Sequence, residues 1–329
     1  MRRVLGLVLL MVVLAGLCLL RFVIDRDPAP GGGLSLAWPE RDYASFRLTA
    51  IMVSVIIGCC LATSGVLLQA LLRNPLASPF ILGLSSGAGL GVMTAMYIGH
   101  VTGNEAMRVG VNAGPALMGG LLVLAIVYGL GRRRGLLDPL SLVLVGVVVA
   151  AICGALMMFL QRLSPEGLRS DILIWMMGRI PQGVPLLHLL MVAGIAIIGT
   201  AIAASLGKAM DAATFGDDEA RSIGLSLKPL RIGMFALAGA LAAAAVTVAG
   251  PIAFVGLIAP HAARLVIGPR HTLLVPAAAL AGAALVVAAD SASQALEFGA
   301  GRMPVGIFTA LIGGPAFIWL LKHRQTAGV

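Results

Sequence analysis

Apolar runs of about 20 residues recur along the whole chain, and their length limits what the chain can fold into. About 20 apolar residues in a helix are needed to cross the hydrocarbon core of a bilayer. Of the 329 residues, 59% are hydrophobic and only 11% are charged, whereas soluble domains carry about 25% charged residues. We therefore expect an all-α polytopic membrane protein with a single transmembrane domain, residues 1–329. The ten predicted spans are 4–24, 46–72, 80–98, 110–131, 138–162, 184–206, 230–249, 251–268, 272–293 and 304–322.

The basic residues predict how the spans are oriented. Arg2 and Arg3 precede the first apolar run as in a signal peptide, but the run continues to about Ile24 without a clear cleavage pattern, so we expect a retained helix. With the N-terminus inside, most of the 23 Lys and Arg residues fall in inner loops, including the triplet 132–134. Both termini are then cytoplasmic. The same bias accounts for the net charge of +9 without nucleic-acid binding.

Two predicted loops are long, an outer linker at 25–45 and an inner segment at 207–231. In the inner segment, Asp217 to Glu219 would begin a short helix, because acidic side chains suit the positive end of the helix dipole. Gly224 would cap that helix and Pro229 would end the helical stretch. The segment can be interpreted as a solvated amphipathic helix or as a docking surface for a cytoplasmic partner.

Two proline-containing motifs interrupt the apolar pattern. The first, RNPLASP, follows the second span and contains Arg73, Asn74 and Pro75; taken alone it is an ordinary loop. The second, GPIAFVGLIAPHAARLVIGPRH, is expected to break helix continuity near one membrane face. Its residues of interest are Gly250, Pro251, Pro260, His261 and Arg264. His261 and Arg264 would share a helix face, with either a functional role or a structural role at carbonyls released by proline. The spacing of possible ligands does not suggest a metal site.

The sequence Gly83-Leu84-Ser85-Ser86-Gly87 matches the G-x-S-x-G pattern of serine hydrolases. This gives an enzymatic alternative, with Ser85 as the nucleophile and His261 as the base. That pattern functions only between a strand and a helix, and no strand is recognisable here. Small residues in a lipid-embedded helix are the favoured interpretation, since they let helices pack closely.

Asp290 lies in the outer half of the ninth predicted span. A carboxylate there is costly unless it faces protein or water. Asp290 could line a pathway or pair locally, and the sequence leaves both open. A proton- or sodium-driven transporter would need a relay of such carboxylates, and Asp290 is the single candidate.

Four strings carry a resemblance to a known family. They are SGVLLQALLRNPLASPFILGLSSGAGLG at 64–91, GDDEARSIG at 216–224, GPIAFVGLIAPHAARLVIG at 250–268 and MPVGIFTALIGGPAFIWLL at 303–321. In this order and spacing they resemble the iron-siderophore, haem and cobalamin permeases of type II ABC importers.

The resemblance implies a multi-pass inner-membrane permease with ten spanning helices that pairs with a second copy or a close paralogue. Two cytoplasmic ATPases would bind the segment 207–231, and a periplasmic binding protein would deliver the substrate. The chain itself would be no enzyme and would hold no cofactor, since ATP and Mg²⁺ bind the ATPases. The positions that match the ATPase-coupling element are Gly216, Asp217, Asp218, Glu219, Ala220, Arg221 and Gly224. An iron-siderophore is the expected substrate, with haem and cobalamin as alternatives.

The chain departs from the family pattern on the outer side. Members often have R-L-P-R before the second helix, where this chain has Arg47-Leu48-Thr49-Ala50, and Gln294 stands where an Arg is common. Arg302 replaces the usual Glu before Pro304. We therefore expect Arg47 and Arg302 to share the docking of the binding protein. The alternative for Arg302 is a local pair with Glu297.

Overall fold

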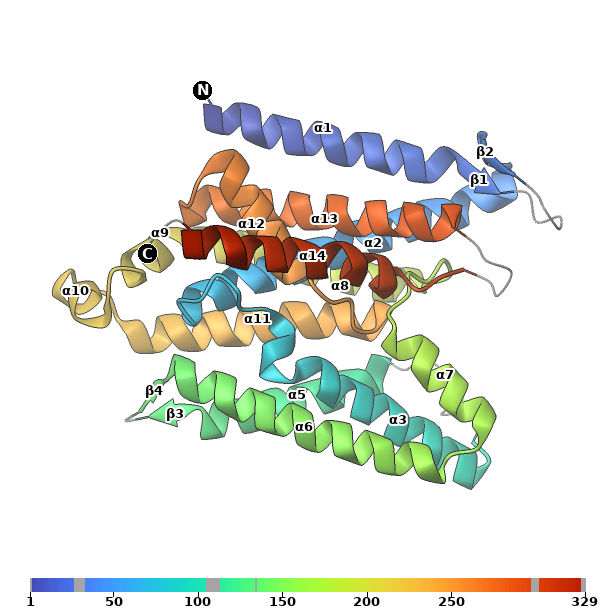
Figure 1. Cartoon of the computed structure of the whole chain (residues 1–329), viewed down its shortest axis with the longest axis horizontal. Coiled ribbons are helices and arrows are strands. Elements are labelled where there is room, and N and C mark those ends of the chain that lie inside the picture. The colour runs from blue at the N-terminus through green and yellow to red at the C-terminus, as the bar shows by residue number, and fades with distance from the viewer. Residues whose placement is uncertain (1, 27–32, 105–112, 134, 297–301, 327–329) are drawn as a thin grey trace.

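The computed structural model describes residues 2–26, 33–104, 113–133, 135–296 and 302–326. Its long helices lie side by side along the longest axis of the molecule (Figure 1). A helix overlaps each of the ten predicted spans, which confirms the all-α fold. These helices are α1 (Arg2–Val23), α2 (Arg41–Leu71), α3 (Leu84–Thr102), α5 (Ala113–Leu130), α6 (Pro139–Leu163), α8 (Leu186–Ser205), α11 (Leu227–Ala249), α12 (Val255–Ile267), α13 (His271–Ala295) and α14 (Val305–Thr326).

Within the described residues, seven of these helices are long and apolar enough by themselves to cross a membrane. The other three, α3, α12 and α14, do not meet both the length criterion and the hydropathy criterion. The structure adds α7 (Glu166–Met176), which we did not predict because its charged and small residues look like a loop. Its buried residues Leu168 and Ile172 are four apart, so they share one helix face.

The predicted outer linker 25–45 is partly structured. Strand β1 (Ile24–Arg26) pairs antiparallel with β2 (Leu34–Leu36), and α2 already begins at Arg41. The predicted linker therefore extends too far, because its last residues, 41–45, belong to α2. Residues 27–32 lie outside those that the structure describes. A second small hairpin, β3 (Arg132–Arg133) with β4 (Leu136–Leu137), joins α5 to α6.

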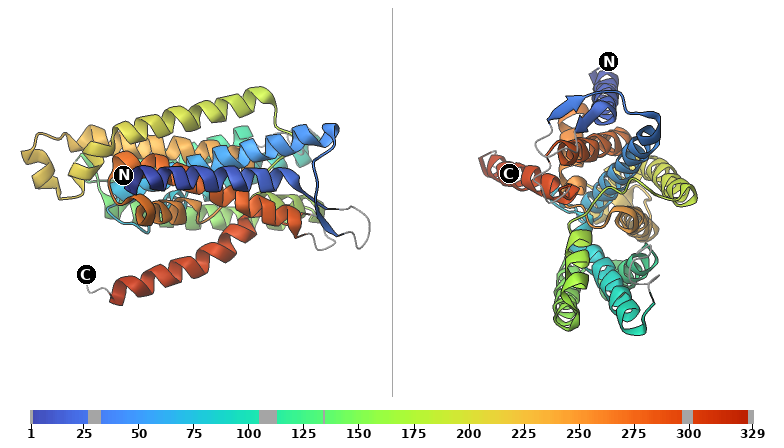
Figure 2. Two further views of the ribbon diagram at one scale, coloured as in Figure 1. Left: turned by 90° about the horizontal axis from the view of Figure 1, so that it is seen from above. Right: turned by 90° about the vertical axis from the view of Figure 1, so that its right-hand side faces the viewer.

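Helix α2 is at the centre of the bundle. In its most apolar window 78% of the residues are buried, against 6% in α1. The helices α8, α11, α12 and α13 pack around α2, while α3, α5 and α6 form a separate lobe (Figure 2). A central helix needs close approach on several sides, and the α2 glycines provide it. A Cβ at Gly58 would overlap the backbone at Gly282 of α13, and one at Gly65 would overlap the carbonyl group of Gly256 of α12.

Replacing Gly65 by alanine should lower the free energy of unfolding by about 1–3 kcal/mol, the usual cost of overpacking. Gly154→Ala in α6 is the matched control, because an added Cβ there meets nothing within 4 Å. It should leave stability unchanged or raise it by up to about 1 kcal/mol. Denaturant unfolding in mixed micelles measures both changes. Equal effects of the two substitutions would contradict this account of the α2–α12 contact.

The two ends of the bundle differ. Helix α1 begins and α14 ends at the end that also carries the β3–β4 hairpin and the short helices α9 (Gly207–Ala213) and α10 (Asp217–Ser222) (Figure 1). We call this the α10 end. The hairpin β1–β2 and one end of α7 lie at the opposite end (Figure 1).

Candidate functional site

The predicted inner segment 207–231 folds into α9, α10 and the first turn of α11, and it protrudes from the bundle (Figure 1). Asp217, Asp218 and Glu219 occupy the first turn of α10, as predicted. Gly224 has a φ of 82° and completes the predicted cap, in which the Leu225 amide donates to the Ala220 carbonyl at 3.0 Å. Pro229 does not end this stretch. It lies in the first turn of α11, where proline is tolerated.

An ion cluster fastens α10 to the bundle. The Arg73 guanidinium donates to Asp217 at 2.5 Å, and the Arg231 guanidinium donates to the same carboxylate oxygen at 2.7 Å. Arg73 also donates to the Ala213 carbonyl at the end of α9, at 3.0 Å. Arg231 is buried in α11 and donates to the Leu137 carbonyl of β4, at 3.1 Å. One carboxylate therefore connects α2, α10 and α11, and its two arginine partners extend the network to α9 and β4.

The electrostatics of this cluster favour the ionised form of Asp217. Partial burial of the carboxyl group raises its pKa, but the Arg73 hydrogen bond and the charges of Arg231 and Arg73 outweigh burial and hold the pKa below its usual value. The Asp217 carboxyl group is therefore ionised at neutral pH.

The backbone at Arg73 is in an unusual conformation. Arg73 follows the last turn of α2 with a φ of 48°, in the left-handed region where glycine is normally found. The Asn74 amide donates to the Gln69 carbonyl at 3.1 Å and closes the helix cap. The Asn74 side chain then accepts from the Leu76 amide at 2.9 Å and turns the chain through Pro75. A left-handed arginine costs about 1–2 kcal/mol, so its side-chain contacts must offset that cost.

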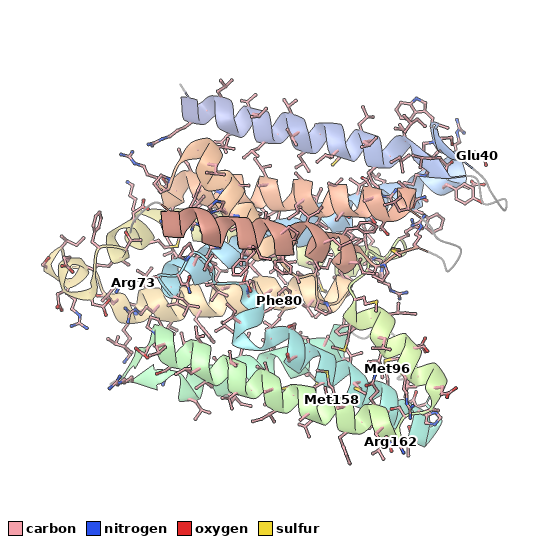
Figure 3. The ribbon with its side chains drawn as sticks, viewed as in Figure 1. Glu40, Arg73, Phe80, Met96, Met158 and Arg162 are labelled. Carbon is pink, nitrogen blue, oxygen red and sulfur yellow. The ribbon has the colours of Figure 1, made fainter. Side chains whose placement is uncertain are left out.

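A second polar contact holds α9 in place. The Asp211 carboxylate accepts from the backbone amide of His271 at 3.1 Å and lies 2.6 Å from its ring nitrogen Nδ1. This satisfies one of the amides at the start of α13 that have no partner in the helix. Between these contacts lies a groove of about 570 Å³, whose lining includes Arg73, Arg264 and Arg270. Figure 3 shows Arg73 at this end of the molecule.

The protruding segment also exposes two large apolar side chains. Phe215, just before α10, is 80% exposed and Ile223, just after it, is 70% exposed. Both lie in a segment rich in charge, outside the apolar length of the neighbouring helices. Exposed apolar groups beyond the membrane-spanning part of a protein are typical of a docking surface.

The predicted break at 250–254 is present. Gly250 has a φ of 69° and Phe254 a φ of 67°, and the chain between α11 and α12 is not helical there. Pro251 lies in this break. The prediction for Pro260 was wrong, because α12 continues through it. The Phe254 ring packs where a side chain at Gly313 of α14 would otherwise lie.

The structure lacks the strand before Ser85 that the serine-hydrolase alternative requires. Ser85 and Ser86 lie in the first turn of α3, preceded by the left-handed Gly83 and a 3-10 turn at Pro79–Leu82. The segment before the serines is therefore not the strand that a nucleophile elbow requires. Gly87 instead allows close packing, since a Cβ there would overlap the backbone at Gly119 of α5. This agrees with the interpretation of Gly87 as a helix-packing residue.

The structure resolves the two possibilities for Asp290. Its carboxylate forms an ion pair with the Arg21 guanidinium of α1. The Arg21 side chain is 1% exposed and that of Asp290 7% exposed. Arg21 lies in the last turn of α1, where it is buried. Asp290 therefore pairs inside the protein and connects α1 to α13.

The two predicted docking arginines differ in their surroundings. Arg47 is 8% exposed, donates to the carbonyls of Phe22 and Ile24 at 2.9 and 3.0 Å, and pairs with Asp25 at 2.7 Å. This burial does not fit the prediction that Arg47 docks the binding protein. The Arg47 side chain instead connects the end of α1 to α2. Arg302 is exposed, and its guanidinium lies beside the side-chain amide of Gln182. The alternative partner Glu297 lies outside the described residues.

Sequence reasoning missed several residues of the α10 end. Arg231 and His271 look like ordinary basic residues at the ends of helices, and Asp211 looks like a loop carboxylate. Their contacts are with residues that are distant in the sequence, so no local signal identifies them. The Arg21–Asp290 pair had a signal, because two lone opposite charges stood in the outer halves of two spans.

Comparison with known proteins gives a consistent result. The model of the FecCD transport family matches residues 35–323. The Halobacterium salinarum protein named cobalamin import system permease protein BtuC is 37% identical over 282 residues, covering 85% of this chain and 73% of that protein. The Escherichia coli Fe(3+) dicitrate transport system permease protein FecD is 32% identical, covering 95% and 96%. A solved structure, described as an inward-facing conformation of a metal-chelate type ABC transporter, superimposes with a TM-score of 0.82 at 29% identity, covering 96% and 98%.

Proposed function

The chain belongs to the FecCD transport family, and on that premise we propose that it is the permease subunit of an ATP-driven importer for an iron chelate. The observation that carries the proposal is the protruding α10 segment, which is fastened at its base by Asp217 and exposes Phe215 and Ile223. A surface anchored in this way can transmit the movement of a bound partner to the helix bundle. The α10 end is then cytoplasmic, together with the start of α1 and the end of α14.

We assign the segment Gly216 to Leu225 to the docking of a cytoplasmic ATPase, which would bind the ATP and Mg²⁺. The matching family string at 216–224 and the exposed apolar pair both support this assignment. A second copy of the chain or a close paralogue would complete the permease, because two ATPases act on two such segments. Neither copy would hydrolyse ATP.

Truncating Phe215 and Ile223 to alanine should weaken binding of the partner ATPase by about ten-fold or more, because buried aromatic and aliphatic anchors dominate such interfaces. The matched control replaces Leu34 and Leu36, which are 56% and 67% exposed at the opposite end, and should have no effect. Pull-down titration in nanodiscs measures the affinity. Unchanged binding after the Phe215 and Ile223 truncation would contradict the assignment.

Reversing the charge of the exposed Glu219 should uncouple ATP hydrolysis from uptake by about ten-fold while the protein remains inserted. Arg221 pairs with Asp218 at 3.9 Å on the same short helix, so its reversal tests the neighbouring position. ATP-dependent uptake and ATPase rate are measured together in proteoliposomes. Normal coupling in the Glu219 variant, and again with Arg221 also reversed, would count against the role of α10.

For the substrate we propose an iron chelate, with a siderophore ahead of haem and cobalamin. The resemblance to the siderophore permeases and the ferric dicitrate name of one relative support this order, while the cobalamin name of another keeps cobalamin as an alternative. Uptake assays with labelled ferric siderophores, haem and cobalamin separate the three. Uptake of cobalamin alone would contradict this ranking of substrates, but the assignment of the chain to an importer would still hold.

A periplasmic binding protein would dock at the end opposite α10, and Arg302 is our remaining candidate there. Arg302→Glu should slow association several-fold and flatten its salt dependence, because exposed charges act mainly on the association rate. Arg162→Glu, an exposed arginine on α6, is the matched control at the same end (Figure 3). Association kinetics at two salt concentrations give the result. Equal rates for wild type and Arg302→Glu would make Arg302 structural.

A further inference from the structure

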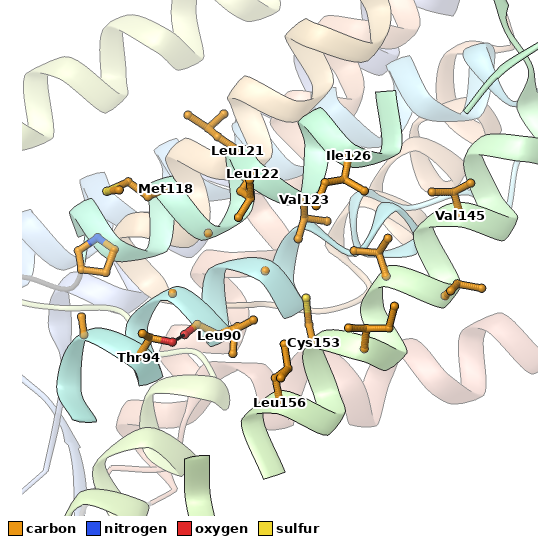
Figure 4. Close-up of a pocket in the computed structure, with 18 of the residues that line it drawn as sticks. Leu90, Thr94, Met118, Leu121, Leu122, Val123, Ile126, Val145, Cys153 and Leu156 are labelled. Atoms are coloured by element: carbon orange, nitrogen blue, oxygen red, sulfur yellow. Dashed lines mark hydrogen bonds between the residues drawn. The ribbon is translucent and has the colours of Figure 1, made fainter. Parts of the chain in front are cut away.

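An apolar trough runs along the outside of the lobe formed by α3, α5 and α6. Its volume is about 1240 Å³, and α5 and α6 form its walls over a floor supplied by α3 (Figure 4). The walls include Leu122, Ile126 and Val148. The hydroxyl group of Thr94, one of the few polar groups of the lining, already donates to the Leu90 carbonyl at 2.7 Å. The trough therefore suits a hydrocarbon ligand and offers little to a polar chelate.

The length of the trough fits an acyl chain. Its lining on α5 extends from Pro115 to Leu130, which at 1.5 Å per residue is about 22 Å. One leaflet of the hydrocarbon core is about 15 Å thick, half of the roughly 30 Å of the bilayer. The trough is therefore long enough to hold the acyl chains of a lipid in the leaflet at the α10 end.

A basic hairpin stands at the end of the trough that lies nearest α10. Strand β3 begins two residues after Leu130, and its Arg132 and Arg133 are both exposed. The Arg132 guanidinium lies 3.9 Å from the centre of the Tyr128 ring, which fixes its position. Stacking uses the face of the guanidinium, whereas a phosphate is bound by the N–H groups on its edge.

The sequence around this hairpin carries a net positive charge. Asp138, a carboxylate close to the hairpin in the sequence, is engaged at the start of α6, where it accepts from the Ser141 amide at 2.9 Å and from its hydroxyl at 2.7 Å. Within residues 128–141 the sequence contains three arginines, at 132–134, and one acid, Asp138. A phosphate headgroup at the level of Arg132 would place its acyl chains directly in the trough.

We propose that this trough is a binding site for one anionic diacyl phospholipid, with its headgroup at Arg132 and Arg133 and its acyl chains between α5 and α6. A second copy of the chain is the competing occupant. The inference does not depend on the transport function.

The test uses the full chain, extracted with its native lipids and also reconstituted in nanodiscs of equal phosphatidylglycerol and phosphatidylethanolamine. Native mass spectrometry counts the retained lipids. The wild-type chain should retain phosphatidylglycerol in preference, and Arg132→Gln with Arg133→Gln should reduce the retained phosphatidylglycerol at least three-fold without changing phosphatidylethanolamine. Arg3→Gln with Arg270→Gln is the matched control, since both residues are exposed at the same end but lie away from α5 and α6.

A second variant tests the trough itself. Val148→Trp fills the space between the walls and should displace the same lipid while both arginines remain. Retention of phosphatidylglycerol in both variants would overturn the proposal, as would an equal loss in the Arg3 and Arg270 control. If Val148→Trp breaks a dimer of the chain and leaves the lipid count unchanged, the trough is an interface between copies and the proposal is wrong.

Discussion

Replacing Asp290 by alanine is expected to lower the free energy of unfolding by about 3–5 kcal/mol, because it leaves the Arg21 guanidinium buried without its counter-charge. Within the described part of the chain, the two terminal nitrogens of Arg21 have no hydrogen-bond partner. The ion pair is therefore the main compensation for burying this charge. Equilibrium unfolding in mixed micelles, followed by circular dichroism, measures the loss.

Removing both charges tells the ion pair apart from simple packing. Arg21→Leu with Asp290→Leu should recover most of the lost stability, since an apolar pair of similar volume often replaces a buried ion pair without cost. Asp25→Ala removes an ion-pair partner that is 39% exposed, and it should cost no more than about 1 kcal/mol. A double variant as unstable as Asp290→Ala would show that the charge itself is not responsible.

Replacing Arg73 by glycine is expected to reduce ATP-dependent uptake ten-fold or more while the chain remains folded. Glycine suits the left-handed backbone at this position better than arginine does, so the cap of α2 should hold or gain about 1 kcal/mol. The change removes the side chain that joins α2 to Ala213 and Asp217. Uptake in proteoliposomes, with ATP supplied and the partner ATPase present, measures the effect.

The position of the α10 segment can be measured separately from transport. In Arg73→Gly, trypsin should cleave after Arg221 faster than in the wild type, because the segment has lost one of its anchors. Arg73→Lys should lie between the two, since lysine keeps the charge but not the fork of donors. Full uptake with unchanged trypsin sensitivity in Arg73→Gly would show that the arginine does not anchor the segment.

Local pattern predicted the ten apolar helices and α10, but it missed α7, α9 and the two small hairpins. The apolar runs located all ten long helices because a bilayer imposes their length, and the charge pattern at Asp217 to Glu219 located α10 because a helix dipole acts within one turn. Helix α7 was missed because its amphipathic face is short and rests on burial against α3. The break at Pro251 was predicted but the one at Pro260 was not found, since neighbouring helices stabilise α12 across that proline.

By itself the sequence determined the membrane class, the order of the ten apolar helices, and the position of the α10 segment, because each of these depends on residues close together in the chain. The tertiary structure alone decided which charges meet. It paired Arg21 with Asp290 across 269 positions and Arg73 with Asp217 across 144, and it buried Arg47 where the sequence suggested an exposed docking residue. Such pairings depend on how helices pack, and packing is set by close contacts such as Gly65 on Gly256, which no short window of sequence contains.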